Sequence, residues 1–336
     1  MVSLGEDGLQ VLDVGDPAQP SVVGNVDTPG TTEVIAAFED VIYRVKDTRL
    51  QVFRVTSSGR PVELRSVDLG LRPGSIAVVD GEFLYLSVSG RQGIAIVSLS
   101  SPRHPRLKGL IEQRVLSFDV EDSKVYTWVS DTGFLVFDTT DPTSPVEIGR
   151  IDNPGGWYSQ LSVSGRLAIA LGGETSIRLI DVSDPANPYD IRSYGEGDES
   201  TISSVELVDG IAVLSAFTDP GGSRIRSYDL RDPSSPRLID EVELLTWSSP
   251  GVVKFNGRRV VVNQKPFKVW AFEARSSGLL NEIDDWKFYP TAESIAVTDR
   301  SLHIALGPIG FVTHDLSMTC EPPRSGGGRV SGRQSP

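Results

Sequence analysis

One segment recurs along the chain and limits the folds that it can adopt. A short apolar strand ends in aspartate, and the pattern Asp-x-x-Asp-Pro-x-x-Pro follows. Four copies match closely: residues 9–20 (LQVLDVGDPAQP), 134–145 (FLVFDTTDPTSP), 177–188 (IRLIDVSDPANP) and 225–236 (IRSYDLRDPSSP). Weaker copies occupy residues 50–61, 94–105, 269–278 and 311–315. Equivalent positions lie 40 to 48 residues apart, a spacing typical of arrays of small structural units.

A second signal, a polar pair between short apolar runs, lies between these copies. Asp-Gly and Asn-Gly pairs favour tight mirror-image turns, which need a positive φ, and so predict β-hairpins. Residues 80–81, 209–210 and 256–257 are Asp-Gly or Asn-Gly, and other polar pairs stand at the equivalent positions 39–40, 122–123, 164–165 and 299–300. Each repeat therefore predicts four strands, a to d, which in one unit are residues 202–208, 211–216, 223–230 and 237–243. Helical periodicity is absent from the sequence.

Four antiparallel strands per repeat are typical of a β-propeller blade. Stacking such blades around an axis buries both faces of each sheet, which explains strands such as 94–97 and 260–262 that are apolar at consecutive positions. We predict an all-β chain with a β-propeller of four-stranded antiparallel blades over residues 1–316. Residues 317–336 are rich in Gly, Ser, Pro and Arg and predict a disordered tail.

The number of blades stays open between seven and eight. The chain has seven a–b hairpins but eight c strands. In the favoured seven-bladed arrangement, the C-terminal a, b and c strands pair with the N-terminal c and d strands, and one c strand is redundant or displaced. In the alternative, the ring has eight blades and its N-terminal part is missing from this chain, so Met1 is not the native start.

Composition restricts the partners. The 336 residues carry a net charge of −13, which repels phosphate backbones and argues against nucleic-acid binding. The single cysteine, Cys320, excludes an intrachain disulfide and a thiolate metal cluster. No apolar run approaches the roughly 20 residues that span a bilayer, and no signal peptide is visible. We expect a monomer.

The paired aspartates of the repeat are assigned to turn closure. The carboxylate of an Asp that ends strand c accepts a backbone N–H of the following turn, and the next Pro fixes φ. A calcium site needs six to eight oxygen ligands, so we expect no metal at these pairs. The assigned residues are Asp13, Asp16, Asp138, Asp141, Asp181, Asp184, Asp229 and Asp232.

The strands predicted to line the central channel carry few side chains that could act in catalysis or bind a metal. The residues that enter them are Val34, Ser75, Ser117, Ser159, Ser204, Gly251 and Ser294. Glu33 and Glu293 lie one position further out, at the channel mouth. This carboxylate pair could bind a cation or share a proton, or could consist of two solvated charges. The three histidines, His104, His303 and His314, are isolated and assemble no catalytic triad.

Aromatic residues give a stronger indication of a binding surface. Trp128 and Trp270 fall in predicted strands and are assigned to the core. Six others fall in d–a connections, which cross one face of the ring: Trp157, Tyr158, Trp247, Trp286, Phe288 and Tyr289. Such residues can stack on sugar rings or anchor a peptide, or can pack locally over the core.

The repeated segment resembles the LVIVD repeat of many bacterial and archaeal surface proteins. The four close copies keep its pattern, whereas Arg54, Ser98 and Glu273 replace the first Asp in three weaker ones. The resemblance covers about residues 8–316. It implies a β-propeller and often a cell-envelope or extracellular setting, and it implies no reaction, cofactor or catalytic residue.

These observations favour a non-catalytic binding or scaffold propeller that engages a protein or glycan on its loop face, without a cofactor or metal. The alternative is a hydrolase or lyase with its site at the mouth of the central channel. A purely structural repeat within a larger envelope protein is a third possibility.

Overall fold

The computed structural model describes most of the repeat region. The described residues are 2–3, 9–13, 21–26, 34–38, 41–46, 48–56, 61–89, 93–101, 104–152, 158–172, 176–195, 201–218, 222–244, 250–255, 257–264, 268–274, 277–287, 294–297, 301–305 and 311–315. The predicted tail, residues 317–336, lies outside them. Every regular element in these ranges is a β-strand. Among the described residues, no helix has the length and apolar character required to span a membrane.

Six of the antiparallel sheets in the described part of the chain have four strands each, paired in sequence order. They are β4 (Val34–Phe38), β5 (Val41–Lys46), β6 (Arg49–Val55) and β7 (Pro61–Asp68); β8 (Pro73–Asp80), β9 (Phe83–Val88), β10 (Gly93–Ser98) and β11 (Arg106–Ile111); β12 (Val115–Glu121), β13 (Lys124–Val129), β14 (Gly133–Asp138) and β15 (Val146–Asp152); β16 (Tyr158–Ser164), β17 (Leu167–Gly172), β18 (Ser176–Asp181) and β19 (Tyr189–Gly195); β20 (Thr201–Val208), β21 (Ile211–Thr218), β22 (Gly222–Asp229) and β23 (Arg237–Leu244); β24 (Pro250–Phe255), β25 (Arg259–Gln264), β26 (Lys268–Ala274) and β27 (Leu280–Lys287).

Two further sheets have three strands each among the described residues. One comprises β1 (Val2–Ser3), β2 (Leu9–Asp13) and β3 (Ser21–Val26), and the other comprises β28 (Ser294–Val297), β29 (Ser301–Ala305) and β30 (Phe311–Asp315).

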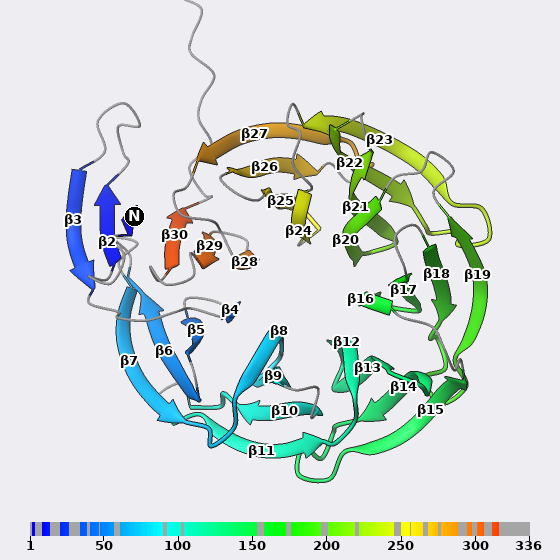
Figure 1. Ribbon diagram of the computed structural model, residues 1–336, viewed down its shortest axis with the longest axis horizontal. Coiled ribbons are helices and arrows are strands. Elements are labelled where there is room, and N and C mark those ends of the chain that lie inside the picture. The colour runs from blue at the N-terminus through cyan, green and yellow to red at the C-terminus, as the bar shows by residue number, and fades with distance from the viewer. Residues whose placement is uncertain are drawn as a thin grey trace, which may run out of the picture.

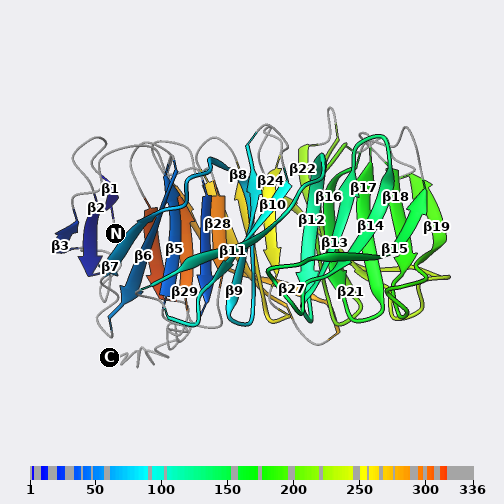
Figure 2. The same cartoon turned by 90° about the horizontal axis from the view of Figure 1, so that it is seen from below.

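The sheets are arranged as blades around an axis (Figure 1). The first strand of each four-stranded sheet lies nearest the centre and the last lies outermost, and Figure 2 shows the strands running between the two faces of the ring. β28 packs against β4, which joins the two ends of the ring, and β1–β3 lie outside β30. The predicted all-β propeller of four-stranded antiparallel blades is confirmed. Its number of blades stays a prediction.

Apolar side chains fill the spaces between neighbouring blades. Among the described residues, five buried clusters each draw residues from two consecutive sheets, such as Trp128 and Phe134 of one blade with Ala168 and Ile180 of the next. In β10 and β17 every residue is buried, because both faces of the sheet meet a neighbour. Burial of apolar area between blades is the dominant stabilising term for such a ring.

The predicted hairpins and strands match the observed ones closely. The four strands predicted from 202 to 243 are β20 to β23, with ends that differ by two residues or fewer. The a–b turns have the expected positive φ: 50° at Asp122 and 58° at Ser123, and 50° at Asp209 and 74° at Gly210. Asp and Gly tolerate this left-handed region better than most residues, so these sequence pairs fix the hairpin register.

The two faces of the ring carry different connections. We call the face with the a–b and c–d turns the turn face; it includes residues 122–123 and 139–145. The opposite face carries the b–c and d–a connections and is called the loop face; it includes residues 69–72, 112–114 and 130–132.

Each c–d strand pair contains a bulge at the same place, and the strand-d residue beside it meets the next blade. The carbonyl of Pro142 lies against Gly109, and that of Pro185 lies against Gly149. At the equivalent position Arg192 donates a hydrogen bond to the Ser234 carbonyl (3.3 Å), and Asp240 accepts one from the Leu280 N–H (2.9 Å). In these four blades the bulge position of strand d therefore contacts the c–d turn of the next blade or the residue just after it.

Candidate functional site

Most of the aromatic and acidic residues singled out from the sequence fall outside the described ranges. Tyr158 is the first residue of β16 and is half-buried. The prediction that Trp286 lies in a d–a connection is wrong, because this residue continues strand β27 and pairs with Val269; its side chain is not among the described ones. Those outside the described residues are Trp157, Trp247, Phe288, Tyr289, Glu33 and Glu293.

Tyr158 packs across a blade boundary at the loop-face end of β16. Its ring centre lies 3.9 Å from that of Trp128 on β13, with the rings tilted by 38°. Trp128 is completely buried and contacts Phe134, ring centre to ring centre, at 6.2 Å. A Cβ on Gly172 would lie 2.6 Å from the Tyr158 ring, so the glycine makes room for it. One edge of the tyrosine is thus fixed by packing, while part of its surface reaches solvent.

A buried cation completes this stack. The guanidinium carbon of Arg178 lies 5.0 Å from the centre of the Trp128 ring and 5.8 Å from that of Tyr158. Two nitrogens of Arg178 donate to the two carboxylate oxygens of Asp190 on β19. Burial alone would lower the pKa of Arg178, but the paired carboxylate raises it. Cation–π attraction and a bidentate ion pair therefore hold the aromatic pair in place.

A row of polar side chains links consecutive inner strands near the centre of the ring. Asp119 of β12 accepts hydrogen bonds from the N–H groups of Val163 on β16 (2.7 Å) and of its neighbour Val120 (2.9 Å). Ser162 of β16 accepts one from the Leu207 N–H on β20 (2.9 Å).

The next link in this row is an ion pair between Glu206 of β20 and Lys254 of β24. Asp119, Ser162 and Glu206 each lie two residues before the last residue of their strand, so these three links use the same position of the repeat.

The charges in this row interact. Burial and the negative charge of Glu206 raise the pKa of Asp119 to about 7, against the opposing effect of the two N–H donors and Lys254. Burial lowers the pKa of Lys254, but Glu206 and Asp119 outweigh it and the net shift is upward. The Asp119 oxygens already accept backbone N–H groups. This geometry indicates that Asp119 links two blades and does not act as a general base that takes a proton from a substrate.

The channel lining differs from the sequence expectation at two positions. Ser117 and Ser204 are buried, at 2% and 1% exposure, rather than facing a solvated channel. Ser117 donates to the Tyr158 carbonyl (3.2 Å), and Ser204 donates to Gln160 (3.1 Å) while accepting from the Val253 N–H (3.1 Å). The reason is that side chains of an inner strand point toward the neighbouring blades. Ser159, in contrast, is exposed.

The described aspartates of the repeat close their turns. Asp138, Asp181 and Asp229 each accept the N–H of the residue two positions on, at 2.8 to 3.1 Å. Asp141, Asp184 and Asp232 do the same at 3.0 to 3.2 Å. Asp13 and Asp16 lie outside the described side chains.

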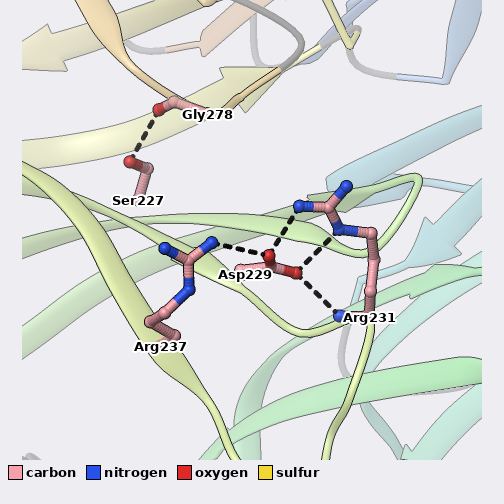
Figure 3. A network of polar contacts seen from close by, with 5 residues as sticks. All are labelled: Ser227, Asp229, Arg231, Arg237 and Gly278. Atoms are coloured by element: carbon pink, nitrogen blue, oxygen red, sulfur yellow. Dashed lines mark hydrogen bonds and ion pairs between the residues drawn. The ribbon is translucent and has the colours of Figure 1, made fainter.

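Asp229 has further partners in two arginines (Figure 3). Arg231 donates through two side-chain nitrogens at 2.8 and 2.6 Å, and Arg237 donates at 3.1 Å. The bonds from Arg231 are the main reason that the pKa of Asp229 lies well below its ordinary value. These carboxylates are thus occupied by their own turns. Within the described ranges, no three His, Cys, Asp or Glu side chains form a group that could hold a metal ion.

Several partners in these contacts were not singled out from the sequence, among them Arg178, Asp190, Asp119, Glu206 and Lys254. Arg178 and Asp190 sit in ordinary strand positions, and nothing local marks them. Asp119 carries one available signal, since an alignment of the repeats places it at the position of Ser162 and Glu206.

The repeat itself matches a known family model. The model of the LVIVD repeat matches residues 2–28 and 119–153, that is, strands β1–β3 and the region from the end of β12 through β15. These two segments of the chain carry the LVIVD repeat. The resemblance inferred from the Asp-x-x-Asp-Pro pattern is therefore confirmed. A comparison with curated protein sequences gives no match.

Solved structures share the fold of this LVIVD-repeat chain at low sequence identity. A protein from Lactobacillus plantarum is 12% identical, with a TM-score of 0.63 over 91% of this chain and 94% of that one. The computationally designed Ika8 protein is 11% identical, with a TM-score of 0.58 over 86% and 97%. Raptor from Chaetomium thermophilum is 13% identical, with a TM-score of 0.64 over 85% of this chain and 27% of Raptor. At these identities the likeness establishes the fold alone.

Proposed function

We propose that this LVIVD-repeat chain is a non-catalytic binding or scaffold propeller of the cell envelope or extracellular space, which engages a protein or glycan through its loop face. The observation that supports this most is the stack of Tyr158 on Trp128. It presents a half-buried aromatic ring at the loop face, on a base of buried Trp128 and Arg178. Aromatic side chains held rigidly at a rim bind sugars and peptides at low entropic cost.

The contrast between the faces supports the same assignment. On the turn face, the described Asp carboxylates of the repeat accept turn N–H groups, and Asp229 also binds two arginines. On the loop face, Tyr158 directly follows a d–a connection that contains Trp157. A second of these connections contains Trp247, and Trp286 lies one residue before the loop-face end of strand β27.

A glycan and peptide array, probed with the purified chain, tests the proposal. Hits are titrated against a variant with Trp157→Ala, Trp247→Ala and Trp286→Ala together. The matched control carries Asp141→Asn, Asp184→Asn and Asp232→Asn on the turn face. Binding lost in the tryptophan variant and kept in the control is the expected result, with both variants folded by circular dichroism. If the tryptophan variant binds as tightly as the wild type, the assignment of the binding surface to the loop face is refuted.

A further inference from the structure

β11 is the outermost strand of its blade, and its outer edge is open. Among the described residues, β11 pairs with β10 alone, and Figure 1 shows it on the outside of the ring. Backbone N–H and C=O groups on such an edge have no ladder partner, so they can pair with a strand of another chain. Which strands can do so depends on the side chains that the edge presents.

β11 differs from the other outer strands of the four-stranded sheets in its charge. β7, β15, β19, β23 and β27 each contain at least one carboxylate, and β23 and β27 contain three each. β11, with the sequence RLKGLI, contains none and carries two cations, Arg106 and Lys108. In a chain with a net charge of −13, this strand presents the opposite charge to its surroundings.

The two cations of β11 are available to a partner. The side chains of Arg106 and Lys108 are exposed, and neither forms an ion pair with a described residue. The arginine of the next outer strand is different, because Arg150 of β15 is paired with Glu147 at 2.6 Å. Cations on β11 therefore repel a basic strand and attract an acidic one.

One side of β11 is apolar and exposed. Leu107 stands opposite Val97, and Leu110 stands opposite Ala95. Val97 and Ala95 belong to the core cluster between the sheets β4–β7 and β8–β11, so both leucines lie on the side of β11 that faces the blade β4–β7. Leu107 is nevertheless 44% exposed and Leu110 36% exposed.

The neighbouring outer strand adds a third apolar side chain to this side. Val62 of β7 stands opposite Arg54, two residues after Val52, which belongs to the same core cluster. Val62 therefore faces the blade β8–β11, and it is 45% exposed. Contiguous exposed apolar side chains on a soluble protein mark interaction sites more often than scattered ones do.

The two sides of β11 together select a pattern in the partner. Arg106 stands opposite Ser98, which follows Val97, so it lies on the side of β11 away from the leucines. An added strand alternates its side chains between the same two sides. If apolar and acidic residues alternate in it, the apolar ones cover the leucines and the carboxylates reach Arg106. A second β11 fits poorly, because antiparallel self-pairing brings the cations of the two copies together.

We propose that β11 is a docking edge for an extended segment of a partner protein in which apolar and acidic residues alternate, and that this segment adds a fifth strand to the sheet β8–β11. Main-chain hydrogen bonds supply affinity in such strand addition, and the flanking side chains supply specificity. The edge lies on the outer rim of the ring, so the inference does not depend on the proposed function of the loop face.

Fluorescence anisotropy with labelled, end-capped peptides tests the docking edge. The probes are the acidic peptide SVEVEVES, its basic counterpart SVKVKVKS and the proline-interrupted peptide SVEPEVES. The test variant carries Arg106→Glu with Lys108→Glu, and Lys108→Glu alone replaces it if the double variant does not fold. The matched control reverses two arginines on other outer strands, Arg150→Glu on β15 with Arg192→Glu on β19. Hydrogen–deuterium exchange of the wild type with the acidic peptide then locates the bound strand.

The expected result is that the acidic peptide binds the wild type and the control variant, and binds the test variant about tenfold more weakly or less, because two attractions become repulsions. The basic peptide and the proline-interrupted peptide should not bind, since proline cannot donate to the ladder. Amides of residues 106–110 should exchange more slowly with the acidic peptide bound.

Three results would overturn the docking edge: no binding of the acidic peptide at millimolar concentration, equal binding of the acidic and basic peptides, or binding without slower exchange at residues 106–110. Sedimentation of the chain alone examines the remaining occupant. A dimer of the wild type that the test variant loses would assign the edge to a second copy, and would overturn the proposal as well.

Discussion

Gly149 lies directly against the backbone carbonyl of Pro185 in the next blade, at a point where a Cβ would come within 2.2 Å of that oxygen. The same relationship joins Gly109 to Pro142, at 2.0 Å. The Asp-Pro turn of one blade thus rests on the outer strand of the blade before it. A glycine in strand d and a proline in the following turn are two parts of one contact between blades.

Replacing Gly149 with alanine is expected to destabilise the ring. The clashing atom belongs to the backbone and cannot rotate away, so the turn of the next blade must shift, at a cost of about 1–3 kcal/mol. Chemical denaturation measures this change. Ser193→Ala, at an exposed position of β19, is the control. A cost for Gly149→Ala within about 0.5 kcal/mol of zero would contradict the contact.

Trp128 and Tyr158 are expected to differ in their contribution to stability. Removing the fully buried indole with Trp128→Ala costs about 3–5 kcal/mol through the cavity that it leaves. Tyr158→Ala loses a half-buried ring and its stacking, so its cost is smaller and the variant stays folded. Denaturation curves of both variants decide this. Equal losses of stability would assign Tyr158 to the core and remove it from the binding surface.

The sequence predicted the fold because its signals are local. Asp209-Gly210 fixes a hairpin through the φ of its own residues, and Asp181 closes a turn two residues away. The contacts between blades depend on residues that are distant in sequence. Arg178 contacts Trp128 only after two blades have packed together, and no spacing of residues in the sequence predicts this contact. The expectation for Ser117 and Ser204 assigned the residue that enters each inner strand to the channel, but both serines directly follow a bulge and turn toward the neighbouring blade.

Asp119 makes stability depend on pH in a defined direction. Its pKa in the folded chain, about 7, lies above the ordinary value of 3.8, so the folded state binds this proton more tightly than the unfolded chain. Its contribution to stability is complete below the unfolded value and is lost as pH rises to about 7. The unfolding free energy of the wild type, minus that of Asp119→Asn, should fall between pH 4 and 7. If this difference in unfolding free energy stays constant from pH 4 to 7, the raised pKa of Asp119 is refuted.

Asp229 should show the opposite dependence. Hydrogen bonds from Arg231 hold its pKa well below the ordinary range, so its stabilisation is present above the unfolded value and is lost as pH falls through the folded one. Asp229→Asn is expected to lower the melting temperature at pH 7. The difference in melting temperature between the wild type and this variant should disappear in strong acid. In an NMR titration, Arg231→Ala should raise the pKa of Asp229. A titration that Arg231→Ala leaves unchanged would argue against this pairing.

The most direct test of the account is to locate the surface that a bound ligand covers. Hydrogen–deuterium exchange of the chain, with and without the tightest array hit, compares the loop face with the turn face. The account predicts slower exchange on the loop face, at residues 112–114 and 130–132 and at the start of β16, with residues 139–145 and 231–236 unchanged. Protection confined to those turn-face segments would contradict it.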